Sequence, residues 1–273
     1  MLITISYGEV TRFDLSRKIT GRGQYWTTAY LLDKMMIDAG CAHTAKELDH
    51  SLIGTRINKI INTHSHEDHF RVNVYLKKRN RELEIYAHPL ATKVLANPDI
   101  YQPLHPYRRL FWGQPEPSDA KPLDHNEVIE TENYRFQVIH TPGHSPDHLC
   151  LYEPNQEWLF TGDLFVGGKD RALRAGCDIW QVIESLKLIT DLPARQMFPN
   201  SARVRQEPAK HLQNKIDYLE EMGEKVLALD QHEKGVGEIA RSLFGGPMLI
   251  ELLTLGHFTR RRLVLSYLGR NPG

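Results

Sequence analysis

The amino-acid sequence predicts an α/β fold that is followed by a helical C-terminal part. Two observations support this prediction. Between residues 27 and 204, short runs rich in β-branched and aromatic residues alternate with segments of helical periodicity, as in sheets covered by helices. Beyond about residue 206 the strand-like alternation stops, and the remaining pattern is helical. We therefore expect two domains, residues 1–205 and residues 206–273.

The composition is typical of a globular protein. The 273 residues are 41% hydrophobic and 25% charged, and the formal net charge is zero with neutral histidines. This balance gives no argument for nucleic acid, although it leaves room for a local basic patch. No apolar run reaches the roughly 18 residues of a membrane span, and the start "MLITISYGEV" lacks the features of a signal peptide. Sparse cysteines outside any CxxC pattern favour a cytoplasmic protein.

The first half of the chain begins with a pair of strands. Residues 27–40 contain two apolar runs with a turn at Asp33-Lys34. Residues 44–54 have a helical pattern that ends at Gly54. The next elements are expected as strands at 56–63 and 83–89 and as helices at 72–80 and 89–97.

The segment 98–122 interrupts this alternation, because it is rich in proline, aromatic residues and arginine. Structureless segments of this length are usually functional or disordered. We expect an irregular lid at the mouth of a binding site, with Arg108 and Arg109 as contacts for anions. The same composition suits a subunit interface, so a homo-oligomer is the alternative.

The second half returns to strands and then ends in helices. Strands are expected at 134–144, 149–154, 157–168 and 194–204. An amphipathic helix is expected at 178–192, before the last of these strands. The helical patterns beyond residue 206 are "AKHLQNKIDYLEEMGEKVLAL", "GEIARSLFG" and "MLIELLTLGHFTRRRLVLSYLG".

A dense run of metal-binding side chains follows the strand expected at 56–63. Within six positions the chain has His64, His66, Asp68 and His69. Side chains two positions apart on an extended strand share one face, so the first two imidazoles point the same way. Imidazole and carboxylate on a tight turn suit zinc, manganese or iron. A polar surface turn is the alternative, but the position directly after an apolar strand favours a metal site.

Two further pieces of this kind follow at later strand ends. "HTPGHSPDH" holds His140, His144 and His148, and Gly143 permits a sharp turn before the second of them. "LFTGDLF" places Asp163 directly after a strand. Each piece alone is a weak signal, since single histidines and Gly-Asp turns are common. The three pieces together, each at the end of a strand, predict one shared metal site.

The three motifs H-x-H-x-D-H, H-T-P-G-H-S and T-G-D, in this order, resemble those of the metallo-β-lactamase superfamily. The resemblance covers about residues 20–205 and includes an early strand pair that ends in Asp-x-Gly. It implies a four-layer αββα sandwich with metal ions at one rim of two facing sheets. It further implies that a first ion is held by His64, His66 and His144, that a second is held by Asp68 and His69, and that Asp163 bridges them.

The sequence departs from the family pattern at the last expected ligand of the second ion. Where Pro-Gly-His-Gly is common, the chain has Pro199-Asn200-Ser201-Ala202, so Ser201 takes the position of the histidine. A hydroxyl is a much weaker ligand than an imidazole. We therefore expect one tightly bound zinc ion and a weaker second position, which is better suited to manganese or iron.

The resemblance gives neighbouring polar residues supporting roles. His140 matches a position that is usually not a ligand, and His148 matches one with an expected structural role. His88 is expected to pack near the site. Glu67 lies between two candidate ligands, and we expect its side chain to point away from the metal, into solvent or behind the ligands.

The resemblance and this ligand set together imply a metal-dependent hydrolase, in which a metal-bound hydroxide attacks a small ester, thioester or lactone. Asp68 is expected to be catalytic, because it is placed to orient the water and to take its proton. The helical end resembles the winged-helix-like C-terminal domain of a hydrolase branch, some members of which act on RNA. The alternatives are a phosphodiester (RNA) hydrolase, a mononuclear iron enzyme similar to persulfide dioxygenases with His64, His144 and Asp163 as ligands, and a non-catalytic binding module.

Two basic segments bear on the substrate, which we expect to be a small molecule. Lys169, Arg171 and Arg174 follow the T-G-D motif and would either bind an anionic substrate or form an ordinary basic loop. The run Arg260-Arg261-Arg262 would contact nucleic acid, although a solvated helix face is the more common role of three successive charges.

Overall fold

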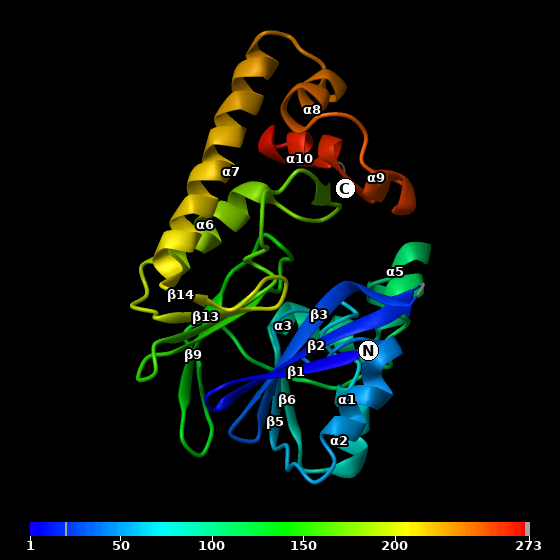
Figure 1. Cartoon of the computed structure of the whole chain (residues 1–273), viewed down its shortest axis with the longest axis vertical. Helices are drawn as coiled ribbons and strands as arrows, with labels where there is room; N and C mark the ends of the chain where they lie inside the picture. Colours follow the sequence, from blue (N-terminus) through cyan, green and yellow to red (C-terminus); the bar gives the residue numbers. More distant parts are fainter. Residues whose placement is uncertain (20, 271–273) are drawn as a thin grey trace.

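Two β-sheets face each other in the structure, a computed structural model that describes residues 1–19 and 21–270 (Figure 1). Within these residues, one sheet has seven strands in the order β1-β2-β3-β4-β5-β6-β7, and the other has six in the order β14-β13-β11-β10-β9-β8. Helices pack on the outer face of each sheet. The four-layer αββα sandwich and the helical C-terminal region predicted from the sequence are therefore confirmed.

The first sheet is built from the N-terminal part of the chain. Its strands are β1 (Leu2–Tyr7), β2 (Val10–Ile19), β3 (Arg22–Leu32), β4 (Met35–Ile37), β5 (Lys59–Asn62), β6 (Glu84–Ala87) and β7 (Lys121–Pro122). Strands β1 to β4 are antiparallel neighbours, whereas β4 to β7 run parallel. Parallel neighbours need long connections, and these contain η1 (Ala42–Thr44), α1 (Ala45–Ser51), α2 (Asn73–Arg79) and α3 (Pro89–Ala96).

The second sheet follows along the chain. Its strands are β8 (Val128–Glu130), β9 (Arg135–His140), β10 (Leu149–Glu153), β11 (Trp158–Gly162), β13 (Gln196–Pro199) and β14 (Arg205–Gln206). Strands β8 to β11 form an antiparallel meander, and β13 then pairs parallel to β11. The crossover between these two strands contains α6 (Ile179–Thr190).

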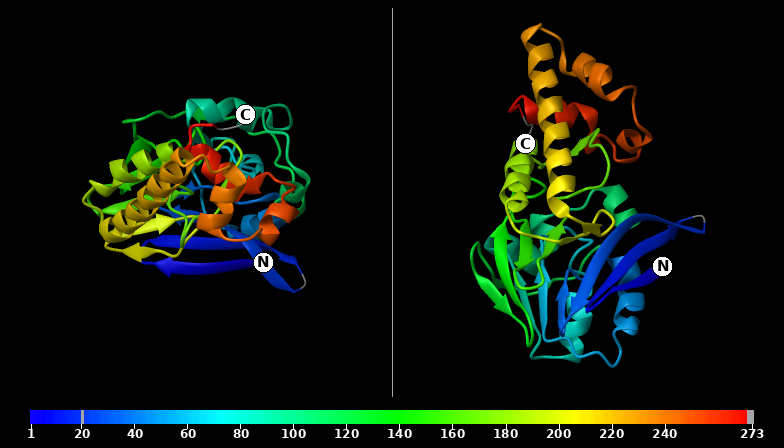
Figure 2. Two further views of the ribbon diagram at one scale, coloured as in Figure 1. Left: turned by 90° about the horizontal axis from the view of Figure 1, so that it is seen from above. Right: turned by 60° about the vertical axis from the view of Figure 1, so that its left-hand side comes forward.

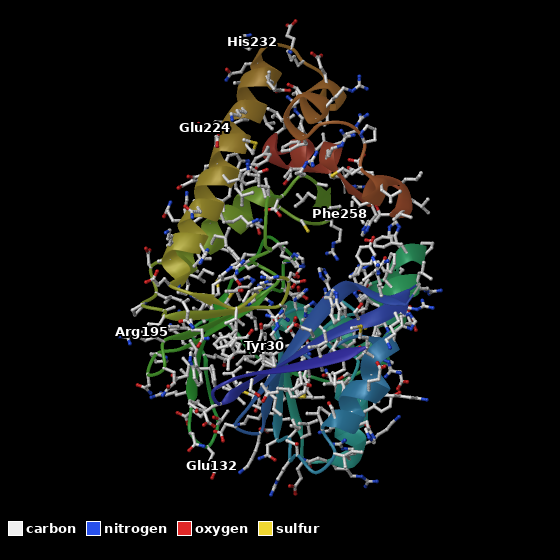
Figure 3. The ribbon with its side chains drawn as sticks, viewed as in Figure 1. Tyr30, Glu132, Arg195, Glu224, His232 and Phe258 are labelled. Atoms are coloured by element: carbon white, nitrogen blue, oxygen red, sulfur yellow. The ribbon has the colours of Figure 1, made fainter. Side chains whose placement is uncertain are left out.

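Apolar side chains from both sheets fill the space between them. Phe160 and Phe198 stack with ring centroids 4.7 Å apart, and Tyr30 meets both rings edge-on. Figure 3 shows Tyr30 in this inner layer. Its hydroxyl donates a hydrogen bond to the carbonyl of Pro199 at 2.6 Å. This bond ties the first sheet to the end of β13, close to where the metal-binding motifs lie.

The C-terminal helices stand at one end of the sandwich (Figure 2). They are α7 (Pro208–Gln231), α8 (Val236–Phe244), α9 (Leu249–Leu253) and α10 (Arg260–Tyr267). Residues of α7, α8 and α10 share one hydrophobic core with α6 and the outer face of the second sheet. The short strands β12 (Leu173–Arg174) and β15 (Phe258–Thr259) also pair, which joins this tail to the loop after β11. Packing is thus continuous across residue 206, and a division into two domains there stays a prediction.

The segment 98–122 is more ordered than the irregular lid that we expected. It contains α4 (Pro98–Tyr101), α5 (Pro106–Phe111) and the edge strand β7. Both helices begin with proline, which has no amide hydrogen to lose in the first turn of a helix. Two of the prolines that suggested a loop, Pro98 and Pro106, are therefore helix starts. Within the described part of the chain, no helix is long and apolar enough to cross a membrane.

Candidate metal centre

The predicted metal-binding motifs meet at one rim of the sandwich. Strands β4, β5 and β6 are parallel, and β9, β11 and β13 also share one direction. The carboxyl ends of strands with a common direction lie at a common edge of the sheet. The segments that follow β5, β9, β11 and β13 carry His64, His144, Asp163 and Ser201, respectively. The folding of the two sheets thus assembles residues that lie far apart in the sequence.

Three imidazoles converge at this rim with their ring nitrogens turned toward one another. His66 Nδ1 lies 2.8 Å from His64 Nε2 and 3.1 Å from His144 Nε2. Burial lowers the pKa of all three imidazoles, that of His144 to about 3. The rings are therefore neutral near pH 7, and each has a lone pair that a metal ion can use.

His69 lies beside them with two carboxylates. Its Nε2 is 3.5 Å from Asp68 Oδ2 and 3.4 Å from Asp163 Oδ2. The same oxygen of Asp163 is 3.7 Å from His144 Nε2, so this carboxylate stands between the two sets of ligands. Two groups of side chains each bring their potential ligand atoms within 4.8 Å of one another. One group is His64, His66 and His144, and the other is His64, His69 and Asp163.

These residues fit a divalent metal ion. His69 Nε2 is buried and, within the described residues, has no hydrogen-bond partner. Buried polar atoms seldom lack a partner, and this one faces the carboxylates of Asp68 and Asp163 at 3.5 and 3.4 Å, which is longer than an ordinary hydrogen bond. Neutral imidazoles and carboxylates are the donors that zinc, manganese and iron accept in proteins.

Asp38 was not predicted as a site residue, yet its carboxylate orients the histidines. It accepts hydrogen bonds from His69 Nδ1 at 2.9 Å and from the hydroxyl of Thr63 at 2.8 Å. Because that hydroxyl donates to Asp38, it accepts from His64 Nδ1, which lies 2.9 Å away. Both rings are thus fixed with Nε2 toward the rim. The sequence signal was the Asp-x-Gly directly after a strand, to which we assigned no role.

His148 has the structural role that we expected. Burial lowers its pKa to about 3, so the ring is neutral. Its Nδ1 bonds the hydroxyl of Thr141 at 2.8 Å, and its Nε2 accepts the backbone N–H of Asp163 at 3.1 Å. Gly162 makes this contact possible, because its φ is +48° and a Cβ there would lie 2.5 Å from the histidine Nε2. The ring therefore fixes the backbone of Asp163.

The residues after β13 also hold ligands in place. The amide of Asn200 donates to the Asp38 carboxylate and, at 3.1 Å, to the carbonyl of Thr28. The hydroxyl of Ser201 donates to Asp163 Oδ1 at 2.6 Å. Ser201 is thus placed at the site, as a partner of the carboxylate. A role of its hydroxyl as a weak metal ligand stays a prediction.

Of the two positions that we expected for the side chain of Glu67, the one in solvent is wrong, and the one behind the ligands is what the structure shows. Its side chain is fully buried, and both of its oxygens are bound by the guanidinium of Arg108, at 2.6 Å for Nε and Oε1. Gln102 also donates to this carboxylate, at 3.3 Å. The pair anchors α5 behind the histidine run. It also means that Arg108, which we expected to contact anions, already has its charge balanced.

A cavity of about 400 Å³ opens onto the centre between the sandwich and the tail. Besides the metal-binding residues, its lining includes Tyr25, Trp26, Tyr107, Trp112, Leu173, Ile250 and Phe258. Figure 3 shows the last of these on the side of the tail that faces the sandwich. Of the segment 98–122, Tyr107, Arg108 and Trp112 line this cavity, as expected for a segment at its mouth. A role of this segment in an oligomer stays a prediction.

The three candidate substrate-binding residues lie in different surroundings. Arg174 lines the cavity. Lys169 lies over the ring of Tyr218, 5.4 Å from its centroid, and Arg171 donates to the carbonyl of Phe244 at 2.5 Å. Of these three basic side chains, Arg174 is therefore the one that lines the cavity at the metal centre.

Other predicted residues lie away from the ligands. His88 and His140 stack on each other with centroids 4.2 Å apart and do not line the cavity. In the arginine run of the tail, Arg260 is buried and bonds Glu251 at 2.6 Å. Both of our interpretations, nucleic-acid contact and solvated face, are wrong for this arginine because its charge is used inside the tail.

The chain belongs to the metallo-β-lactamase superfamily. The sequence profile described as "Metallo-beta-lactamase superfamily" matches residues 27–201, which contain the predicted ligands from both sheets. A metallo-beta-lactamase family protein from Thermus thermophilus has the same fold, with a TM-score of 0.69 and 18% identity over 94% of this chain and 93% of that one. The flavodiiron core of Flv1 from Synechocystis sp. PCC6803 has a TM-score of 0.64 and 16% identity, over 82% of this chain and 62% of that one.

The alignments with proteins of related sequence cover only part of each of those proteins. The Beta-lactamase-like protein 2 homolog of Drosophila melanogaster is 32% identical over 113 residues, 41% of this chain and 37% of that protein. The atrochrysone carboxyl ACP thioesterase of Aspergillus fumigatus is 25% identical over 209 residues, 74% of this chain and 58% of that protein. The chain thus spans less than two thirds of both relatives.

Proposed function

We propose that the protein is a metal-dependent hydrolase that cleaves a small ester, thioester or lactone. The observation that carries this proposal is the convergence of three neutral imidazoles, His64, His66 and His144, of which the last two line a mostly apolar cavity. A divalent ion in such a site lowers the pKa of a bound water toward 7 and polarises a substrate carbonyl. The cavity volume of about 400 Å³ is in the range of small-molecule pockets.

The residues of the chain have separate roles in this proposal. Asp68 lines the cavity and acts as the general base that takes a proton from the attacking water. Its backbone carbonyl accepts the hydroxyl of Thr27 at 3.1 Å, which fixes the turn that carries it. Asp163 is the shared ligand, held by Ser201 on one oxygen and by His148 at its backbone. Aromatic rings such as Trp112 exclude water from the apolar part of the substrate.

The relatives support an acyl substrate over other classes. One relative is named a thioesterase, and it aligns with 74% of this chain. Zinc is the metal that we propose for the three imidazoles, with manganese or iron at the second position. A cytoplasmic location belongs to the same proposal, since no disulfide joins the three buried cysteines of the described chain.

Metal analysis combined with a substrate panel tests this function. The purified full chain is analysed for bound metals and then assayed with ester, thioester, lactone and phosphodiester substrates. We expect bound zinc and hydrolysis of at least one acyl substrate that stops when a chelator removes the metal. His140→Ala is the matched control, because it removes an imidazole from the same motif without touching the ligands. Turnover of phosphodiesters alone, or turnover that survives complete metal removal, would refute the proposal.

A mononuclear iron oxygenase is the second candidate. His64, His69 and Asp163 form a compact group of two imidazoles and one carboxylate, the ligand set of non-haem iron oxygenases. This group differs from the set that we predicted, in which His144 took the place of His69. Iron in the isolated protein, together with consumption of oxygen during turnover of a persulfide, would favour this candidate over the hydrolase.

A further inference from the structure

Arg174 is the charged group of the cavity lining that the described protein leaves unbalanced. The other lining arginine, Arg108, is paired with Glu67. Asp170, the lining carboxylate outside the metal centre, is bound by Lys215 at 2.6 Å. Arg174 has no carboxylate partner among the residues that the structure describes. Its Nε is buried there without a hydrogen-bond partner, and its side chain contacts Cys177.

The tail holds Arg174 in place beside the metal centre. Arg174 pairs with Phe258 in the β12–β15 ladder, and the next residue donates its N–H to the carbonyl of His257 at 2.9 Å. Arg174 lines the same cavity as His66 and His144. A substrate whose carbonyl reaches the imidazoles therefore lies within reach of this arginine.

We propose that Arg174 binds a carboxylate of the substrate, so that the favoured substrate is an ester or thioester whose apolar acyl part carries one negative charge. The inference rests on the hydrolase function proposed above and names its substrate class. A planar guanidinium matches a carboxylate with two parallel hydrogen bonds. A single unbalanced arginine suits this singly charged group better than a phosphate, which carries a charge of about −1.5 to −2 near neutral pH.

The cavity also explains why a neutral substrate would bind less well. A substrate without the carboxylate would keep water away from Arg174 and offer it no acceptor, and a buried donor without a partner is costly. The aromatic walls formed by Tyr25, Trp26 and Trp112 suit the apolar part of the acyl group. Charge and apolar surface are thus both provided in one cavity.

Three thioesters of N-acetylcysteamine test the proposal on the zinc-loaded full chain. The glutaryl thioester carries a carboxylate, the glutaramoyl thioester replaces it by a neutral amide, and the 4-phosphonobutanoyl thioester replaces it by a doubly charged group. We expect kcat/KM to be about tenfold or more higher for the glutaryl thioester than for the other two. Arg174→Gln should remove this preference mainly through KM. Lys169→Gln, which removes a charge of the same loop outside the cavity, should keep it.

Binding of glutarate, measured by isothermal titration, gives a readout that does not depend on turnover. Arg174→Gln should weaken it about tenfold, and Lys169→Gln should leave it unchanged. If Arg174→Gln unfolds, Arg174→Met replaces it with the same expected losses. Equal turnover of glutaryl and glutaramoyl thioesters, or a preference that survives the loss of Arg174, overturns this inference and leaves the hydrolase standing. A preference for the phosphonate overturns the choice of carboxylate. Turnover of no acyl substrate by the zinc-loaded chain overturns the hydrolase itself.

Discussion

The two halves of the metal centre differ in chemistry. The imidazole half consists of His64, His66 and His144, and the carboxylate half consists of Asp68, His69 and Asp163. In the imidazole half, burial lowers the pKa of each ring, and the rings stay neutral. In the carboxylate half, burial also acts to lower the pKa of His69, but the charges of Asp68, Asp38 and Asp163 outweigh it and hold that pKa well above its usual value. One half thus offers lone pairs, and the other offers negative charge.

This difference predicts that metals bind unequally to the two halves. Three imidazoles and a shared carboxylate would form a strong ligand set for zinc. The carboxylate half provides one imidazole and two carboxylates, and the hydroxyl of Ser201 is directed at Asp163 Oδ1. Its donors are harder on average, so manganese or iron is favoured there over zinc. We expect the isolated protein to hold nearer one tightly bound metal than two.

The largest effect should come from breaking the imidazole half. His64→Ala or His144→Ala should abolish activity and release the tightly bound metal, because each removes a strong ligand from the more complete set. Changes behind the ligands typically cost about 10–100-fold, so loss of a ligand should cost more. Activity and elemental analysis check this, and circular dichroism should show a retained fold. Wild-type turnover with full metal content in either variant would show that the ligands are assigned wrongly.

Replacement of the proposed general base should lower the rate of hydrolysis without releasing the tightly bound metal. Asp68→Asn keeps the size of the side chain but removes its basicity, so kcat should fall by about 10²–10⁴-fold. The tight metal should remain, since the imidazole half is untouched. The measurement is kcat together with zinc content after dialysis. Loss of the tight zinc in this variant would mean that Asp68 belongs to the stronger site.

Asp38→Asn should produce a smaller effect on the weaker half. The amide keeps the shape but is a poorer acceptor for His69 Nδ1, so His69 loses part of its orientation and basicity. His64 is held only indirectly, through the hydroxyl of Thr63, and should be affected less. We expect manganese affinity at the second position to fall by about 10–100-fold. Manganese titration followed by electron paramagnetic resonance checks this, with zinc at the first position. An equal loss of zinc and manganese would show that the two halves respond as one site.

The convergence of the candidate ligands was predictable from the sequence because each of them follows a strand. His64, His144 and Asp163 are separated by many residues, but strands of common direction bring their ends to one rim. The metal motifs are local patterns, and the sheet supplies the long-range contact. The supporting role of Asp38 was visible only as an Asp-x-Gly, since nothing nearby in the sequence shows that it accepts a bond from His69.

Long-range pairs outside the motifs were not predictable from local patterns. Glu67 and Arg108 are 41 residues apart, and neither periodicity nor composition indicates that they meet in the core. The pairing of β12 with β15 involves two residues on each side, too few to show alternation. From the sequence, Lys169 and Arg174 therefore belong to one basic loop. In the structure, pairing with the tail places Arg174 in the lining of the cavity, whereas Lys169 lies outside it.

The smallest expected effect is a gain in metal affinity in the carboxylate half. Ser201→His places an imidazole where the family pattern has one, next to Asp163. It should tighten the second metal position and raise the metal content after dialysis from nearer one toward two equivalents. The wild-type hydroxyl bond to Asp163 is lost in this variant, so the gain should be smaller than that of a full ligand. Ser201→Ala is the matched control, because it removes the same bond without adding a ligand. The inequality of the two halves is refuted if the wild-type chain already keeps two equivalents after extensive dialysis, whatever the variant does.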